Sequence, residues 1–165
     1  MLFQSDISDV VRIAVNRARR IAPGMTITMA CPPMLPAIKG DATLVEHVVF
    51  NLLDNAIKFS RNNQGIDVVV SVGDRMITIT VTDMGCGIPP EALTRIFEPF
   101  FRVREGDGEV SGTGLGLAIC KRVVDGMGGT IEVQSPVSGG NGTRVRVMLP
   151  VPIEAADSQT DGLRR

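Results

Sequence analysis

The stretch Asn51-Leu52-Leu53-Asp54-Asn55-Ala56-Ile57-Lys58 restricts the possible folds and functions of this chain more than any other part of the sequence. Asn51, Asn55 and Lys58 are spaced so that on an α-helix they share one stripe, opposite an apolar face. Carboxamide oxygens can hold a hydrated Mg²⁺, and an ammonium group can approach the phosphates that the ion bridges. The stretch therefore predicts a helix that forms one wall of a phosphate site. A solvated helix face is the alternative for all three residues.

Two glycine-punctuated loops follow in the chain: Asp83-Met84-Gly85-Cys86-Gly87-Ile88-Pro89 and Gly112-Thr113-Gly114-Leu115-Gly116-Leu117. An aspartate that ends a strand before Gly-x-Gly can read the edge of a base, although it can also simply cap the following turn. A glycine-rich loop can wrap phosphates with its backbone N–H groups. Taken with the helix, the two loops predict a nucleotide site.

Composition excludes several other classes of protein. The chain has 165 residues, enough for one domain with a good core, and a net charge of −1, which gives no basic surface for nucleic acid. No apolar run approaches the ~20 residues of a membrane span, and there is no signal-peptide pattern. The three cysteines, Cys31, Cys86 and Cys120, are far apart in the sequence and form no Cys-x-x-Cys motif. Their number and spacing argue against a zinc site or a disulfide framework and favour a reducing compartment.

Hydrophobic periodicity predicts helices alternating with pairs of strands. The expected helices cover 8–21, capped by Ser8, then 41–59, capped by Asp41, a short segment from Pro89, and 115–124. The expected strands cover 25–30, 66–72, 76–82, 131–134 and 143–149, with a turn at Gly73-Asp74. The buried side of the long helix is expected to comprise Leu44, Val45, Val48, Leu52, Leu53, Ala56 and Phe59. This order predicts an α/β two-layer sandwich, a mixed sheet covered on one face by helices.

Neither common phosphate-loop fold fits the glycine pattern. The Walker pattern Gly-x-x-x-x-Gly-Lys-Ser/Thr is absent, and Gly112-x-Gly114-x-Gly116 lacks the Gly-x-Gly-x-x-Gly spacing of a dinucleotide fold.

From residue 9 to residue 150 the chain instead resembles the catalytic, ATP-binding (HATPase) domain of bacterial sensor histidine kinases. That domain belongs to the Bergerat-fold, or GHKL, superfamily with gyrase, Hsp90 and MutL. The resemblance rests on Glu46–Lys58 as the N box, Asp83–Pro89 as the G1 box, Phe97–Arg102 as the F box, Gly112–Leu117 as the G2 box, and Gly142-Thr143 as the last glycine motif. Residues 101–108 are similar to those of KdpD-type sensors. The implied organisation is a linker remnant over 1–8, the catalytic domain over 9–152 and a flexible tail over 153–165.

The resemblance implies roles for the polar residues. Asp83 would accept a hydrogen bond from the adenine amine, which selects adenine over guanine because a carboxylate only accepts. Asn55 would be the Mg²⁺ ligand with Asn51 beside the metal and phosphates, and Lys58 would approach a phosphate. Arg102 or Arg104, in a mobile lid over 102–113, would reach the γ-phosphate unless they are surface charges.

The remaining implied site residues are glycines and their apolar neighbours. The glycines supply N–H donors and room for the ligand, and the helix after Gly114 directs its positive end at the phosphates. Phe97, Phe100 and Phe101 would anchor the lid, or belong in part to the core. The implied cofactor-binding set is Asp83, Gly85, Gly87, Ile88, Phe97, Gly112, Thr113, Gly114, Leu115, Gly116, Leu117 and Thr143.

Asn51 indicates the reaction type. In the ATPases of the superfamily, and in anti-sigma-factor kinases, a glutamate stands four residues before the metal asparagine and activates the nucleophile; a carboxamide is no general base. The resemblance therefore favours transfer of the γ-phosphoryl group to an intrinsically reactive histidine. The alternatives are a GHKL-type ATPase or anti-sigma-like serine kinase, and a nucleotide-binding pseudokinase module.

The only histidine, His47, stands before Val48-Val49 rather than in the His-Glu/Asp context of a phosphoacceptor, so it is expected on the helix surface or behind the site. The acceptor would then lie on a separate dimerisation hairpin of the same full-length protein. The expected partners are that hairpin and a cytoplasmic response regulator, with no nucleic acid and no direct membrane contact. The expected state is a cytoplasmic monomer. Cys86, inside the G1 box, is expected beside the adenine pocket, either as a nucleotide-protected thiol or as a small residue at a permissive position.

Overall fold

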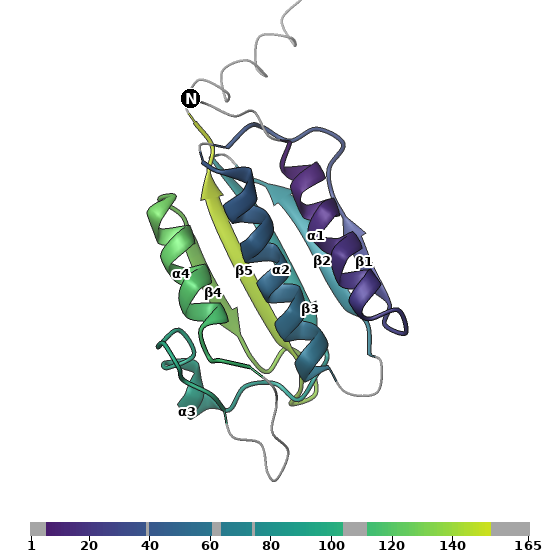
Figure 1. Ribbon diagram of the computed structural model, residues 1–165, viewed down its shortest axis with the longest axis vertical. Coiled ribbons are helices and arrows are strands. Elements are labelled where there is room, and N and C mark those ends of the chain that lie inside the picture. Colours follow the sequence, from purple (N-terminus) through teal and green to yellow (C-terminus); the bar gives the residue numbers. More distant parts are fainter. Residues whose placement is uncertain (1–5, 39, 61–63, 74, 104–111, 153–165) are drawn as a thin grey trace, which may run out of the picture.

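The computed structural model of the chain describes residues 6–38, 40–60, 64–73, 75–103 and 112–152. Nine elements follow one another within these residues (Figure 1), and their order alternates helices with strands as the sequence predicts. They are α1 (Ile7–Ile21), β1 (Ile27–Ala30), α2 (Ala42–Phe59), β2 (Ile66–Val72), β3 (Met76–Asp83), α3 (Pro90–Leu93), α4 (Gly116–Gly126), β4 (Thr130–Gln134) and β5 (Thr143–Pro150).

The strands form one mixed sheet in the order β1-β2-β3-β5-β4. β1 pairs with β2 in parallel, and the other neighbouring strands are antiparallel. Figure 1 shows α1, α2 and α4 side by side on one face of this sheet. The predicted two-layer α/β sandwich is therefore confirmed.

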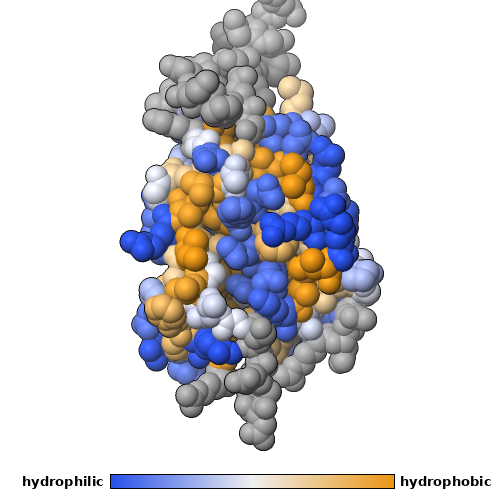
Figure 2. Space-filling view, viewed as in Figure 1, coloured by the Kyte–Doolittle hydropathy of each residue, from blue (hydrophilic) through white to orange (hydrophobic). Residues whose placement is uncertain are grey.

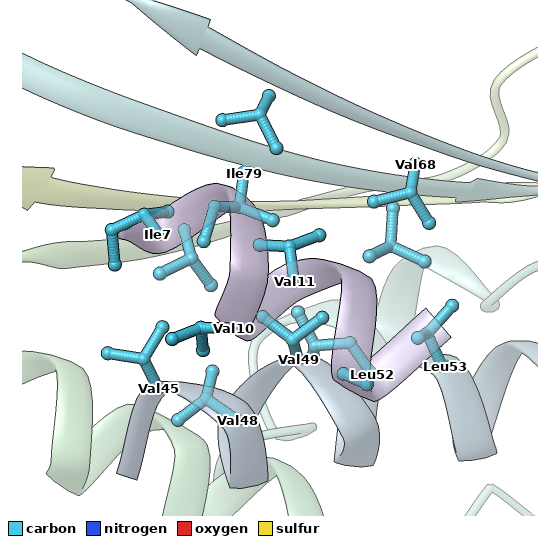
Figure 3. Packing of buried hydrophobic residues seen from close by; sticks show 14 of the residues in the cluster. Ile7, Val10, Val11, Val45, Val48, Val49, Leu52, Leu53, Val68 and Ile79 are labelled. Carbon is cyan, nitrogen blue, oxygen red and sulfur yellow. The ribbon is translucent and has the colours of Figure 1, made fainter. Parts of the chain in front are cut away.

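The core lies between the helices and the sheet. In β3 the buried residues Ile77, Ile79 and Val81 alternate with partly exposed threonines, because successive side chains of a strand point to opposite faces. Figure 3 shows Ile79 on the sheet side of this core and Val49 and Leu52 on the side of α2. Asp83 continues the inward alternation of β3, and it is the one charged or polar side chain that the described residues bury. Its position marks the site described below.

The helix termini follow from their caps, with one correction. Asp41 accepts a hydrogen bond from the backbone N–H of Thr43 at 2.8 Å, so the predicted cap of α2 is confirmed. The predicted cap of α1 is wrong: Asp6, not Ser8, is the N-cap, and its carboxylate accepts from the backbone N–H of Ser8 at 2.9 Å. The earlier start brings Ile7 into the helix and buries it completely.

Two further expectations are corrected. Leu44 is 41% exposed, because the buried stripe of α2 begins at Val45. The first strand begins at Ile27 rather than at Met25. Of the expected linker remnant over 1–8, residues 1–5 lie outside the described residues, whereas Ile7 and Ser8 already belong to α1. Asp74 of the hairpin turn and the tail over 153–165 also lie outside the described residues.

The outer surface of the helical layer is mixed in character. Figure 2 shows hydrophilic residues interspersed with apolar areas on this face. In the described part of the chain, no helix combines the length and apolar character needed to cross a bilayer.

Candidate nucleotide-binding site

One cavity, of about 240 Å³, gathers most of the predicted site residues at the end of the sandwich where α2 and β3 finish and where β5 and α4 begin. The predicted residues that line it are Asn51, Asn55, Lys58, Asp83, Gly87, Ile88, Arg102, Gly112, Thr113, Gly114, Gly116, Leu117 and Thr143. Gly85, Phe97 and Leu115, also predicted, are not in its lining. Segments more than 90 residues apart in the sequence therefore meet around one space.

Asp83 is one of the residues that line the cavity. Its Oδ1 accepts a hydrogen bond from the backbone N–H of Gly85 at 2.8 Å, and the backbone N–H of Thr143 is a second donor to the carboxylate. Burial raises the pKa of this carboxyl above its ordinary value, and the two backbone hydrogen bonds partly oppose that rise. The side chain is thus held rigidly by the backbone, with an exposed fraction of only 6%.

The loop after Asp83 lies against the end of α2. The backbone N–H of Cys86 donates to the carbonyl oxygen of Phe59 at 3.3 Å. A Cβ atom on Gly85 would lie 2.1 Å from that same oxygen, so only glycine allows this approach. Gly85 therefore has a structural reason for its identity although it does not line the cavity.

The C-terminal half of α2 forms a further part of the cavity wall. Asn51 and Asn55 both line the cavity, as the predicted stripe requires. Lys58 also lines it, and its Nζ contacts Asp54 Oδ2 at 2.5 Å, an i,i+4 ion pair in which both side chains are partly exposed. Such a pair stabilises a helix by only ~0.3–0.5 kcal/mol, so the ammonium can exchange the carboxylate for a phosphate at small cost.

The N-terminus of α4 faces Asn51. A Cβ atom on Gly116, the first residue of α4, would lie 3.7 Å from Asn51 Oδ1. The N-cap residue Leu115 supplies no side-chain hydrogen bond to the helix. The backbone N–H groups of this first turn carry the positive end of the helix dipole, which favours an anion in the cavity.

A buried thiol lies behind the same asparagine. Cys120 is fully buried, and its Sγ–H donates to the carbonyl oxygen of Val48, with an S···O distance of 3.8 Å. Burial raises the pKa of this thiol to about 12, and a hydrogen bond from Asn51 acts in the opposite direction. Cys120 is therefore a neutral thiol that contacts one end of the Asn51 carboxamide.

The three phenylalanines of the predicted F box occupy three different environments. Phe97 packs against the core, and Phe101 lines the cavity with the Arg95 guanidinium 4.5 Å above its ring. Phe100 is 71% exposed and has a positive φ of 65°. Its backbone N–H donates to the Gly114 carbonyl at 2.9 Å, so the segments that flank the predicted lid over 102–113 are in contact. Arg104 and the rest of 104–111 lie outside the described residues.

The structure adds lining residues that the motifs did not indicate. Apolar side chains from the sheet and the following segment complete the cavity: Val81, Ile96, Val133 and Val145. Val81, Val133 and Val145 follow the ordinary alternation of their strands, and Ile96 lies outside the strands, so no signal in the sequence separates them from other apolar residues. Cys86 lines the cavity as expected, whereas His47 is exposed and is not among the lining residues.

The residues fit Mg²⁺ only together with a ligand. In the described ranges no cluster of three or more His, Cys, Asp or Glu side chains could hold a metal ion. The cavity does offer the two carboxamides of Asn51 and Asn55. Because Mg²⁺ prefers oxygen ligands and retains waters, amide oxygens suit it where phosphates supply further ligands.

Comparison with known proteins gives concordant matches. Residues 40–153 match the family model described as histidine kinase-, DNA gyrase B- and HSP90-like ATPase. The chain is 36% identical over 138 residues to the sensor histidine kinase Hik2 of Thermosynechococcus vestitus and spans 36% of that protein's length. It is also 36% identical over 138 residues to the sensor protein KdpD of Clostridium acetobutylicum, of which it spans 15%. The equal identities do not single out a KdpD-type subfamily.

The fold comparison agrees. A solved structure of the mycobacterial sensor histidine kinase MprB superposes with a TM-score of 0.80 at 31% identity, covering 90% of this chain and 99% of that one. The family match covers well over half of the chain, and it contains the helix α2, the loop after Asp83 and the N-terminus of α4 that build the cavity. The chain belongs to the histidine kinase-, DNA gyrase B- and HSP90-like ATPase family, and its fold is that of a sensor histidine kinase catalytic domain.

Proposed function

We propose that the cavity binds Mg-ATP, with the adenine at Asp83 and the phosphates between α2 and the N-terminus of α4. The observation that carries this proposal is the placement of one buried carboxylate and two carboxamides at separate places on the wall of a single cavity. The apolar residues Ile88 and Val133 provide surfaces suited to a flat base. Family membership supports ATP as the nucleotide.

Asp83 would select the base. The exocyclic amine of adenine donates hydrogen bonds, and the carboxylate only accepts them. The hydrogen bonds from Gly85 and Thr143 hold the carboxylate in place before the base arrives, so little order is lost on binding. Guanine presents a carbonyl oxygen at the same edge and would face this carboxylate unfavourably.

The phosphates would lie at the other wall. Asn55 and Asn51 are the residues that would hold Mg²⁺, whose charge would neutralise the phosphate oxygens. The first-turn N–H groups of α4 and the Lys58 ammonium would stabilise the same charge. Arg102, which also lines the cavity, would contribute a further cation.

We further propose that the γ-phosphoryl group passes to a histidine on a separate dimerisation hairpin. The carboxamide of Asn51, four residues before Asn55, cannot act as a general base. An imidazole nitrogen is nucleophilic without such a base. In the transfer the bond between the γ-phosphorus and the ADP oxygen breaks, a P–N bond forms, and the displaced imidazole proton leaves to solvent.

The wider setting belongs to this proposal. The chain spans about a third or less of the curated sensor proteins it matches. We infer that it works in the cytoplasm as a monomeric unit of a two-component system and that a response regulator receives the phosphoryl group from the histidine.

The test is transfer in trans. The protein is incubated with γ-labelled Mg-ATP and the separately purified phosphoacceptor hairpin of the parent protein. The expected product is an acid-labile, alkali-stable label on the hairpin with the wild type, and none with Asn55→Ala. Asn16→Ala, at an exposed position on α1, should behave as wild type. Steady release of inorganic phosphate without a hairpin would instead indicate an ATPase, and nucleotide binding without transfer would indicate a pseudokinase.

A further inference from the structure

Ser135, which directly follows β4, joins two segments that border the cavity. Its Oγ accepts a hydrogen bond from the backbone N–H of Ile88 at 2.8 Å and donates one to the carbonyl oxygen of Gly142 at 2.8 Å. Both distances lie within the ordinary ranges for N–H···O and O–H···O hydrogen bonds, and the side chain is partly buried. A hydroxyl can accept and donate at the same time, so this one group satisfies both backbone partners.

Both hydrogen-bond partners of Ser135, Ile88 and Gly142, lie in segments next to Asp83. Ile88 lines the cavity at the end of the loop that begins at Asp83. Gly142 directly precedes β5, and its backbone N–H donates to the carbonyl oxygen of Gly85 at 2.9 Å. Hydrogen bonds therefore fix the loop at Gly85 and again at Ile88, and Ser135 supplies the second fixation.

The contact is also sterically close. A Cβ atom on Gly87 would lie 3.0 Å from Ser135 Oγ, so the loop backbone passes directly over the hydroxyl. Ser135 itself is not among the residues that line the cavity. Any effect of Ser135 on a ligand must therefore pass through the segments it bonds, the loop before Ile88 and the start of β5.

We propose that Ser135 is a positioning residue for recognition of the nucleotide base. Its hydroxyl holds the backbone of Ile88 and Gly142 so that the loop from Gly85 to Ile88 keeps its place beside Asp83. This inference rests on the proposed function, because it takes the base to lie at the Asp83 end of the cavity. Within the part of the chain that the structure describes, the Ser135 hydroxyl bonds to Ile88 and Gly142 and to neither α2 nor α4, so the phosphate end built from these helices is expected to be independent of it.

The test compares Ser135→Ala with the control Ser138→Ala, an exposed serine on the same connection between β4 and β5. Calorimetric titrations with ATP and ADP, each with and without Mg²⁺, are combined with thermal unfolding of the free protein. Ser135→Ala should bind ATP and ADP about 3- to 30-fold more weakly, as expected for losing one or two hydrogen bonds. The ratio of affinities with and without Mg²⁺ should remain that of the wild type. Ser138→Ala should match the wild type in every measurement.

Three results would overturn the inference. Wild-type affinity in Ser135→Ala would leave the proposed function intact but remove the role of the hydroxyl. If Ser135→Ala lost nucleotide affinity together with the Mg²⁺ effect and unfolded at a much lower temperature, the hydroxyl would have a general structural role. Absence of nucleotide binding by the wild type would remove the proposed function and this inference together. If Ser135→Ala does not fold, Ser135→Cys is tested instead, because it is nearly isosteric and forms weaker hydrogen bonds. It should show the same reduction in affinity for ATP and ADP with an unchanged Mg²⁺ effect.

Discussion

Gly85 and Phe59 are in direct backbone contact: the carbonyl oxygen of Phe59 lies 2.1 Å from the position that a Cβ atom on Gly85 would occupy. Phe59 is the last residue of α2, and Gly85 follows Asp83 in the loop after β3. This approach places the helix that carries the asparagines against the loop that follows the buried Asp83. The geometry of the whole cavity therefore depends on the absence of a side chain at residue 85.

Gly85→Ala should destabilise the protein and weaken nucleotide binding together. The added methyl must push the loop away from α2, and overpacking of this kind typically costs ~1–3 kcal/mol. Thermal unfolding and ATP titration measure the two effects. Gly126→Ala is the matched control, since a Cβ there meets nothing within 4 Å, and in a helix alanine is favoured over glycine. If Gly85→Ala behaved like this control, the close contact would have no energetic importance.

As the pH is lowered, the affinity for ATP should begin to fall at a higher pH than it would if Asp83 had the ordinary pKa of an aspartate. Burial raises the pKa of Asp83, so its carboxylate takes up a proton earlier as the pH is lowered and ceases to be a pure acceptor. Titrations at decreasing pH measure this loss. The same protocol with Asp83→Asn corrects for protonation of ATP itself, and identical pH profiles for the two proteins would contradict the role of Asp83.

The same raised pKa has an opposite effect on the stability of the free protein. Because the folded-state pKa of Asp83 is above the unfolded value, its contribution to stability is fully present below the unfolded pKa. That contribution is lost as the pH rises through the folded pKa. The free energy of unfolding, measured between the unfolded-state and folded-state pKa of Asp83, should decline with rising pH in the wild type and not in Asp83→Asn.

Asn55→Ala should remove the part of ATP binding that depends on Mg²⁺. The carboxamide that would ligate the ion is lost, and we expect a reduction at least as large as the ~10- to 100-fold that changes around metal ligands cause. Binding measured without Mg²⁺ should change little, because Asp83 and the apolar walls remain. An undiminished Mg²⁺ effect would show that Asn55 does not hold the ion.

Cys86 should be alkylated slowly in the presence of Mg-ADP and faster without it, because it lines the cavity. Cys120 is fully buried with a pKa raised to about 12, so it should remain unlabelled in the folded protein. Mass spectrometry locates the label, and Cys86→Ser identifies the signal. Equal rates for Cys86 with and without nucleotide would place the base elsewhere.

The helix α2 and the end of β3 could be predicted because their signals are local. Asp41 caps α2, the apolar stripe of α2 repeats along many residues, and the alternation of β3 ends at Asp83. The errors at Ser8 and Leu44 concern where α1 begins and where the buried stripe of α2 begins. Tertiary packing decides such choices, because burying Ile7 completely favours the earlier start of α1.

Ser135 could not be found in the same way. Its partner Ile88 is 47 residues away, and a serine after a strand looks like any other loop residue. The cavity-lining residues Val133 and Val145 could not be recognised from the sequence either, since core and cavity positions share one periodicity. The motifs indicated polar residues that line the cavity, whereas the contacts that hold those residues required the fold.

The most direct measurement is a calorimetric titration of this protein with ATP, with and without Mg²⁺, for the wild type and for Asp83→Asn. Asp9→Asn, which changes an exposed aspartate on α1, is the control. The account predicts Mg²⁺-assisted binding by the wild type and by Asp9→Asn, and binding by Asp83→Asn that is weaker by roughly 1.5–3 kcal/mol, or ~10- to 150-fold. Absence of binding by the wild type, or equal affinity in Asp83→Asn, would contradict the assignment of this cavity as the nucleotide site.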